Sequence, residues 1–169
     1  GQTDVPLDDT GRRQASALAQ YLSDEPIRAI YASDLQRARE TARIVAERHA
    51  CSVQADPRLR EINFGRWEGR THREIENQEP RALAAWHDDP LNARPPGGET
   101  LAQVIERVTP VLGALTSRHS DQTALVVGHG AALRVLLCLA LDLDPRVYWR
   151  FRLDLSSLSQ LDVAARSSV

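Results

Sequence analysis

The chain has 169 residues, of which 42% are hydrophobic and 26% are charged, as expected for one globular domain that buries a core. A formal net charge of -2 argues against a nucleic-acid or membrane-surface partner, and no apolar run approaches the roughly 20 residues of a membrane span. All 21 basic residues are arginine, which excludes Schiff-base and P-loop lysine chemistry. The two cysteines, Cys51 and Cys138, are far apart in unlike settings, so we expect no disulfide and a cytoplasmic location.

The first half of the chain alternates helix-like and strand-like segments. Residues 1–9 read as a loop, and apolar spacing predicts a helix over 10–25 that ends at Pro26. A short strand over 28–33 then precedes a helix over 34–50, for which Ser33 or Asp34 is a natural N-cap. Residues 52–55 form another strand candidate.

The second half continues the alternation. Gly65 and Gly69 indicate turns, residues 71–86 predict one or two short helices, and 88–99 form a Pro- and Gly-rich loop. Residues 100–119 predict a long amphipathic helix perturbed by Pro110. A buried strand over 123–128 runs directly into a helix over 129–141, and alternation over 157–164 predicts a late strand.

This alternation predicts a single domain over 1–169 with an α/β fold: a three-layer α/β/α sandwich around a mostly parallel sheet. A doubly wound sheet normally has a strand before its first helix. We therefore expect a first strand on a segment that precedes Gly1.

Two strand-to-helix junctions carry residues suited to phosphate chemistry. His129 and Gly130 begin the helix after the strand over 123–128, and Arg37 lies in the first turn of the helix after the strand over 28–33. If both strands are parallel, these residues face one crevice at the carboxyl ends of the strands. A helix N-terminus there favours phosphate, and a guanidinium can bind its oxygens in pairs. Glu61, beside a glycine-rich turn, is a candidate proton donor.

Each candidate also has a purely structural interpretation. Arg37 could be a solvated helix-face residue, and Glu61 could form a salt bridge with Arg58 or Arg60. The remaining histidines are at helix ends or in polar segments, without the spacing of metal ligands, so we expect neither a metal nor a cofactor. They are His49, His72, His87 and His119.

Five ordered motifs strongly resemble those of the histidine phosphatase superfamily, in its phosphoglycerate-mutase-like branch. They are "GQTDVPLDDTGRRQA", "YASDLQRARETA", "LREINFGRWEG", "PPGGET" and "VVGHG". The match runs over nearly the whole chain and is nearest to the small bacterial phosphatases of that branch, such as α-ribazole phosphatases and broad-specificity relatives.

The resemblance implies a role for each matching residue. Glu61 corresponds to the proton donor and His129 to the histidine that contacts the phosphoryl group. Arg37 corresponds to a phosphate-binding arginine, and Gly1 and Gly130 to positions that line the pocket. The family's nucleophilic histidine belongs to an Arg-His-Gly motif that none of the five histidines here matches, and we expect it upstream of Gly1.

The resemblance thus implies a metal-independent phosphomonoester hydrolase that acts on a small phosphorylated metabolite through a phosphohistidine, with a homodimer as a candidate assembly. Phosphoglycerate mutase is an alternative, although the short route from Trp67 to Gly97 leaves little room for the basic insertion typical of mutases. A non-catalytic binding or scaffold protein with this fold is an alternative of another class.

Overall fold

We analysed a computed structural model, which describes residues 1–163. The chain begins with an extended segment and then forms α1 (Asp9–Tyr21), β1 (Ile27–Ala32), α2 (Gln36–Ala46) and β2 (Val53–Ala55). Two 3₁₀ turns, η1 (Pro57–Leu59) and η2 (Gly65–Trp67), lead to the short helices α3 (His72–Gln78) and α4 (Pro80–Asp88). The long helix α5 (Leu101–Arg118) precedes β3 (Thr123–Val127), α6 (Gly130–Ala140) and η3 (Pro145–Arg150).

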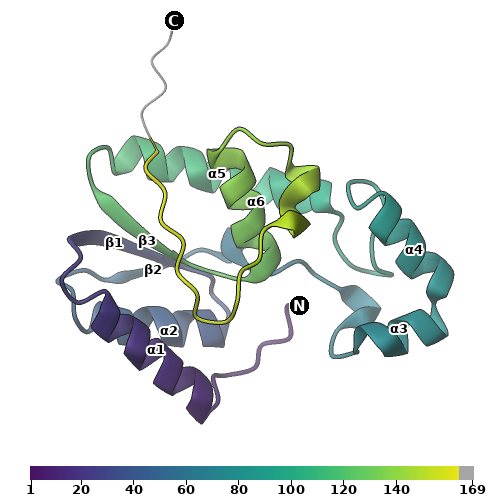
Figure 1. The fold of residues 1–169 in the computed structure, drawn as a ribbon, viewed down its shortest axis with the longest axis horizontal. Coiled ribbons are helices and arrows are strands. Elements are labelled where there is room, and N and C mark those ends of the chain that lie inside the picture. Colours follow the sequence, from purple (N-terminus) through teal and green to yellow (C-terminus); the bar gives the residue numbers. More distant parts are fainter. Residues whose placement is uncertain (164–169) are drawn as a thin grey trace, which may run out of the picture.

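The described strands form one parallel sheet in the order β2-β1-β3. Helices α1 and α2 lie on one side of this sheet and α5 and α6 on the other, which gives three layers (Figure 1). The predicted α/β/α sandwich with a parallel sheet is therefore confirmed. Strand β3 is only half-buried, more exposed than its apolar sequence predicts, because it is an edge strand of the described sheet.

Alternation along the strands divides the core between the two faces of the sheet. Ile30, Ala32 and Ala42 pack in the cluster shared with α1 and α2, together with Leu125 and Val127. The alternate residues of β1 and β3 face α5 instead, in a cluster that contains Ala29, Tyr31, Val111, Ala124 and Val126.

The N-cap of α2 differs from the prediction. Leu35 is the N-cap and provides no side-chain hydrogen bond. The Asp34 carboxylate is held by Arg60, at 2.7 and 2.5 Å, and so does not cap the helix. Asp4 caps the helix instead: its Oδ1 accepts a hydrogen bond from the Gln36 backbone N–H at 2.7 Å. A residue 32 positions away in the sequence therefore caps α2.

The predicted late strand over 157–164 is wrong for its described part. Residues 157–163 have no strand pairing, and residue 164 is outside the described residues. Alternating sequence forms a strand only where another strand's edge pairs with it. The chain runs from η3 to α1, where Leu155 and Leu158 border a shallow hollow beside Leu18 and Tyr21, and then turns back and leads away from α1 (Figure 1).

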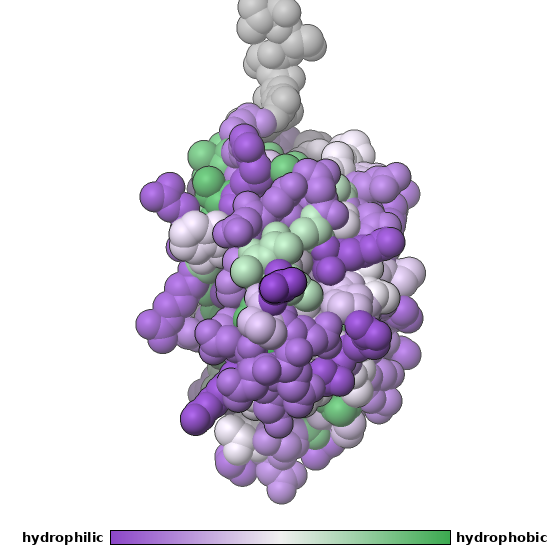
Figure 2. All heavy atoms as spheres, turned by 90° about the vertical axis from the view of Figure 1, so that its right-hand side faces the viewer, coloured by the Kyte–Doolittle hydropathy of each residue, from purple (hydrophilic) through white to green (hydrophobic). Residues whose placement is uncertain are grey.

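Helices α3 and α4 form a projecting lobe, so the segment predicted to hold one or two short helices over 71–86 holds two, the second of which ends at Asp88. A Thr71–Glu74 capping box begins α3, and Pro80 begins α4. Ile75 of α3 and Leu83 of α4 pack with Trp67 of η2 in one buried cluster. Figure 2 shows that the outer face on this side of the molecule is mainly hydrophilic. Among residues 1–163, no helix is both long and apolar enough to cross a membrane.

Candidate active site

Glu61 lies just after η1, and its side chain points to the start of α6. Its Oε1 accepts hydrogen bonds from the backbone N–H groups of Ile62 and Ala131, both at 2.9 Å. The Ala131 N–H is one of the donors that every helix N-terminus leaves without an intrahelical partner. A Cβ atom on Gly130 would lie 3.4 Å from Glu61 Oε2, an ordinary contact distance, so the carboxyl group is adjacent to the start of the helix. The structure therefore brings Glu61 and Gly130 together.

The salt bridges that could have explained Glu61 structurally are not formed. Arg58 instead binds Asp56, at 2.6 Å, and Arg60 binds Asp34. Both arginines hold the pKa of their carboxyl partner below its ordinary value, mainly through side-chain hydrogen bonds. Glu61 is thus held by backbone donors, and its Oε2 has no hydrogen bond or ion pair to the described residues.

His129 is the N-cap of α6 and is only 9% exposed. Its Nε2 is buried and has no hydrogen-bond partner among residues 1–163. Burial, assisted by the positive charge of Arg37, lowers the pKa of His129 to about 3. The imidazole is therefore neutral at physiological pH, and one of its nitrogens can donate a hydrogen bond.

Arg37 is held in place by the extended segment at the start of the chain. Its Nη1 donates to the Thr3 carbonyl oxygen at 2.8 Å, and its Nη2 donates to the Gly1 carbonyl oxygen at 2.7 Å. Arg37 is thus not simply a solvated helix-face residue. A guanidinium has five N–H donors, so three remain for a ligand. Its positive charge also contributes to the lowered pKa of His129.

The five residues expected at the site therefore lie in one region. Arg37 follows β1 and His129 follows β3, at the carboxyl ends of adjacent parallel strands. Glu61 reaches the same place from the loop after η1. In α/β sheets this edge is where ligands bind. The arrangement offers a carboxyl group, a neutral imidazole and a guanidinium, which can protonate a leaving group and stabilise phosphoryl oxygens.

Glu68 is a site-forming residue that the sequence analysis missed. Its carboxylate accepts from the backbone N–H groups of Gln2, Thr3 and Phe64, at 2.8, 3.0 and 3.0 Å, and from the Thr3 hydroxyl at 2.8 Å. Burial raises the pKa of Glu68, but these hydrogen bonds outweigh burial and lower it to about 2. A Cβ atom at Gly1 would lie 2.1 Å from the Glu68 carboxylate oxygens, so the site here has no room for a side chain.

Arg107 and Glu99 form a second arrangement that was missed. The Arg107 guanidinium binds both carboxylate oxygens of Glu99, at 2.9 and 3.1 Å. It also donates to the carbonyl oxygens of Arg58, Arg60 and Glu61, at 2.6, 2.8 and 3.1 Å. The Arg107–Glu99 pair therefore fixes the backbone that presents Glu61. One signal was available: Arg107 directly precedes the buried Val108 on an amphipathic helix.

The backbone around Glu61 is fixed from a further direction. Segment 63–66 runs against segment 96–99, with hydrogen bonds from Glu99 N to Asn63 O and from Arg66 N to Pro96 O, both at 2.9 Å. Gly65 has a φ of +52°, and a Cβ atom on it would lie 2.3 Å from Pro96 O. Glycine is required there, as the sequence indicated, because the two backbones approach so closely.

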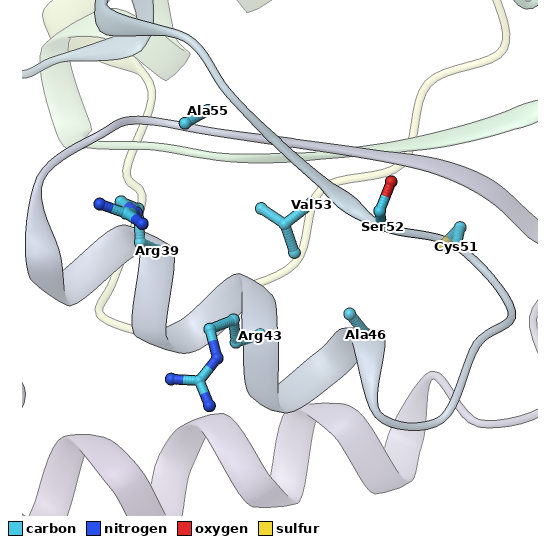
Figure 3. Close-up of a pocket in the computed structure, with 7 residues that line it drawn as sticks. All are labelled: Arg39, Arg43, Ala46, Cys51, Ser52, Val53 and Ala55. Atoms are coloured by element: carbon cyan, nitrogen blue, oxygen red, sulfur yellow. The ribbon is translucent and has the colours of Figure 1, made fainter.

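A hollow of about 310 Å³ lies elsewhere, between α2 and the outer edge of β2. Figure 3 shows Arg39 and Arg43 projecting from α2 beside Cys51, Ser52 and Val53. It shares no lining residue with the site around Glu61 and His129. Both cysteines are free, and residues 1–163 contain no group of three or more His, Cys, Asp or Glu side chains suited to a metal ion.

Comparison with known proteins identifies the family. The model of the histidine phosphatase superfamily (branch 1) matches residues 1–168. Phosphoserine phosphatase 1 of Hydrogenobacter thermophilus is 35% identical over 169 residues, which cover 100% of this chain and 80% of the relative. The "Probable phosphoglycerate mutase GpmB" of Erwinia tasmaniensis is 38% identical over 162 residues, covering 96% and 75%.

A solved structure agrees with these relatives. The α-ribazole phosphatase from Shigella flexneri superimposes with a TM-score of 0.82 at 31% identity, covering 92% of this chain and 77% of that one. Sequence motifs, fold and relatives therefore agree, and the chain belongs to the histidine phosphatase superfamily.

Proposed function

We propose that this protein hydrolyses phosphomonoesters of small metabolites through a phosphohistidine intermediate and without a metal ion, in the cytoplasm. The observation that carries the proposal is the placement of Arg37 and His129 after the adjacent parallel strands β1 and β3, with Glu61 bound to the start of α6. Relatives named as phosphatases, among them the phosphoserine and α-ribazole enzymes, support hydrolysis as the reaction.

The reaction has two balanced steps. In the first, a histidine nitrogen attacks phosphorus, the bond from phosphorus to the leaving oxygen breaks, and Glu61 gives its proton to that oxygen. In the second, the Glu61 carboxylate removes a proton from water, whose oxygen attacks phosphorus and releases the histidine with inorganic phosphate. Arg37 and the neutral His129 donate hydrogen bonds to the phosphoryl oxygens, where charge is spread in the transition state.

The attacking histidine in this proposal lies N-terminal to Gly1. All five histidines of the chain are among the described residues, and His129 alone is at the site. His119 binds Tyr31 and Gln122, His72 stacks on His87 in the α3–α4 lobe, and His49 follows the C-terminal end of α2. The encoded sequence upstream of Gly1 tests this point directly: an Arg-His-Gly motif there supports catalysis, and its absence favours the non-catalytic scaffold.

The activity is tested on the complete protein as its gene encodes it. We expect phosphate release from p-nitrophenyl phosphate and from a panel of phosphorylated metabolites between pH 5 and 8, undiminished by EDTA. His129→Ala should lower kcat several hundred-fold, as the loss of a transition-state donor does. His87→Ala, an exposed histidine on α4, is the matched control and should leave kcat unchanged. The proposal is contradicted if no substrate is hydrolysed, and an unaffected His129→Ala variant would remove His129 from the site.

Mutase activity is the second candidate, because two relatives carry the name "Probable phosphoglycerate mutase GpmB". A mutase returns the phosphoryl group to its substrate instead of to water. Following 3-phosphoglycerate by ³¹P NMR separates the two reactions, since hydrolysis yields inorganic phosphate and isomerisation yields 2-phosphoglycerate. We expect inorganic phosphate.

A further inference from the structure

Arg60 directly precedes Glu61 in the chain, but the two side chains bind on different sides of the loop that carries them. The backbone at Arg60 is extended, with φ of -56° and ψ of 155°, and successive side chains of an extended segment point to different sides. Glu61 binds the start of α6 through the Ala131 N–H. The Arg60 guanidinium instead binds both carboxylate oxygens of Asp34, at 2.7 and 2.5 Å. Asp34 therefore directs Arg60 away from the acid next to it.

Asp34 lies on a well-fixed backbone at the carboxyl end of β1. The residue before it, Ser33, is fully buried, and its N–H donates to the Val127 carbonyl oxygen of β3 at 2.9 Å. The pKa of the Asp34 carboxyl is lowered and the pKa of Arg60 is raised, in each case mainly by the side-chain hydrogen bonds between them. The pair therefore keeps both charges across the pH range of an enzyme assay.

Two other arginines of the same region are also paired with carboxylates other than Glu61. Arg58 binds Asp56 at 2.6 Å. Arg107 binds Glu99 at 2.9 Å while it holds the backbone of the loop. The positive charges that the fold needs around this loop are thus compensated by partners that do not take part in the proposed reaction.

The remaining titratable groups that face Glu61 come from α6 and η3. A Cβ atom on Gly130 would lie 3.4 Å from Glu61 Oε2 and 3.8 Å from Arg134 Nη1, so both groups border the same point. His129 begins α6 and is neutral, and the Glu61 charge contributes to the raised pKa of the buried Tyr148. One cation therefore already faces the Glu61 carboxyl group, and a second cation would add to its effect.

A general acid must keep its proton until the leaving oxygen takes it. Two backbone N–H groups bind Glu61 Oε1, and one of them belongs to the N-terminus of α6, so the surroundings already favour the ionised carboxylate. A free guanidinium next to Glu61 would favour the carboxylate further. Fewer protein molecules would then carry the proton that the first step of the reaction uses.

We propose that Asp34 is a positioning residue that holds the Arg60 guanidinium away from Glu61 and so preserves the protonated acid for the leaving group. This inference rests on the proposed phosphatase function and adds to it a residue that acts through other side chains. Loss of Asp34 should therefore impair proton donation at high pH, and removal of Arg60 in the same protein should repair the damage.

The test measures kcat/KM between pH 5 and 9 in the complete protein, on phenyl phosphate and on p-nitrophenyl phosphate. Phenolate is a poor leaving group that needs a proton, whereas p-nitrophenolate leaves readily without one. Asp34→Asn should move the alkaline limb of the phenyl phosphate profile about one unit to lower pH, as a nearby cation does. The loss should reach about 10-fold on the alkaline side, stay small at pH 5 and be weaker for p-nitrophenyl phosphate.

Two further variants separate the restraint of Arg60 from a purely structural role of the ion pair. Asp34→Asn/Arg60→Gln removes the cation together with its partner, so it should return the alkaline limb close to its wild-type position. Asp34→Glu keeps the charge and should keep the wild-type limb. Glu40→Gln is the matched control, because it frees Arg12, which Glu40 binds at 2.6 Å between α1 and α2. It should leave both profiles unchanged.

An equal loss at every pH and on both substrates, not repaired in the double variant, would show that the ion pair only joins the loop to β1. That result would overturn the inference, as would an Asp34→Asn profile identical to wild type. A wild-type protein that hydrolyses neither substrate would instead contradict the proposed function itself.

Discussion

At the scale of single residues, the Glu68 carboxylate orders the site, although it is not one of the groups proposed to act on the phosphoryl group. It accepts four hydrogen bonds and joins residues 2 and 3 to the turn at Phe64. The pKa of Glu68 is lowered from 4.5 to about 2, so folding favours the ionised form. This stabilisation is complete above about pH 4.5 and is lost as the pH falls toward 2.

Glu68→Gln should therefore lower the free energy of unfolding by about 2 kcal/mol at pH 7, because it weakens hydrogen bonds to a charged acceptor. The deficit should shrink at pH 3, where the wild-type carboxylate is more often protonated in the unfolded chain. Urea unfolding followed by tryptophan fluorescence at both pH values measures this difference. Glu76→Gln, an exposed residue on α3, is the control and should change stability little at either pH. A deficit that is equal at pH 7 and pH 3 would contradict the assignment.

Which site residues could be predicted from the sequence depends on the kind of contact they make. His129 directly follows a strand, so its position at this junction makes it a candidate from the sequence alone. Arg37 has a similar position but could equally be a solvated helix-face residue, and the family resemblance was needed to favour a role for it. Glu61 needed the family resemblance, because a glutamate among arginines resembles a salt-bridge partner. Glu68 and Glu99 could not be found by pattern, since their carboxylates bind backbone N–H groups of distant segments.

At the scale of elements, apolar spacing predicted the positions of the helices and buried strands. It did not predict how a helix is capped or whether a segment pairs at the edge of the sheet. The cap of α2 comes from Asp4, and the apolar alternation over 157–163 forms no strand. Both outcomes depend on what lies beside an element in space. Periodicity describes only which face of an element is apolar, so such contacts are invisible to it.

Helix α5 allows a test of how much a proline inside a helix lowers the stability of the fold. Pro110 lies inside it and is exposed, so its ring removes one helix hydrogen bond without filling the core. Pro110→Ala should raise the free energy of unfolding by roughly 1–3 kcal/mol, given the low helix propensity of proline. Thermal unfolding measures the change, and Glu106→Ala, an exposed residue of the same helix, should shift the midpoint far less. A lowered midpoint in Pro110→Ala would show that the helix depends on the proline.

At the scale of the whole molecule, the layers meet at the site through the Arg107–Glu99 pair. Arg107 comes from α5 and pairs with Glu99 from the loop before it, and Arg107 also binds the carbonyl oxygens of residues 58, 60 and 61. The long helix on one face of the sheet therefore determines where Glu61 stands relative to α6. Arg107 acts through Glu61 and is a positioning residue.

Arg107→Met should consequently lower kcat about 10-fold or more and leave KM nearly unchanged, because a displaced acid affects proton transfer more than binding. Arg107→Lys should recover part of kcat, since it keeps the charge but offers fewer directed hydrogen bonds. Steady-state kinetics on one substrate separates kcat from KM, and Arg118→Ala, at the exposed end of the same helix, is the control. If KM rises while kcat is retained, Arg107 belongs to substrate binding and not to the positioning of Glu61.

The hydrogen bonds from Arg37 to the carbonyl oxygens of Gly1 and Thr3 have a consequence for binding entropy. A free arginine side chain samples many rotamers, and ordering one on binding costs about 0.5–1.5 kcal/mol. In this protein two contacts within the fold itself already select one rotamer and aim the remaining donors. Most of that loss of freedom is thus incurred when the chain folds, so phosphate meets a guanidinium that is already ordered.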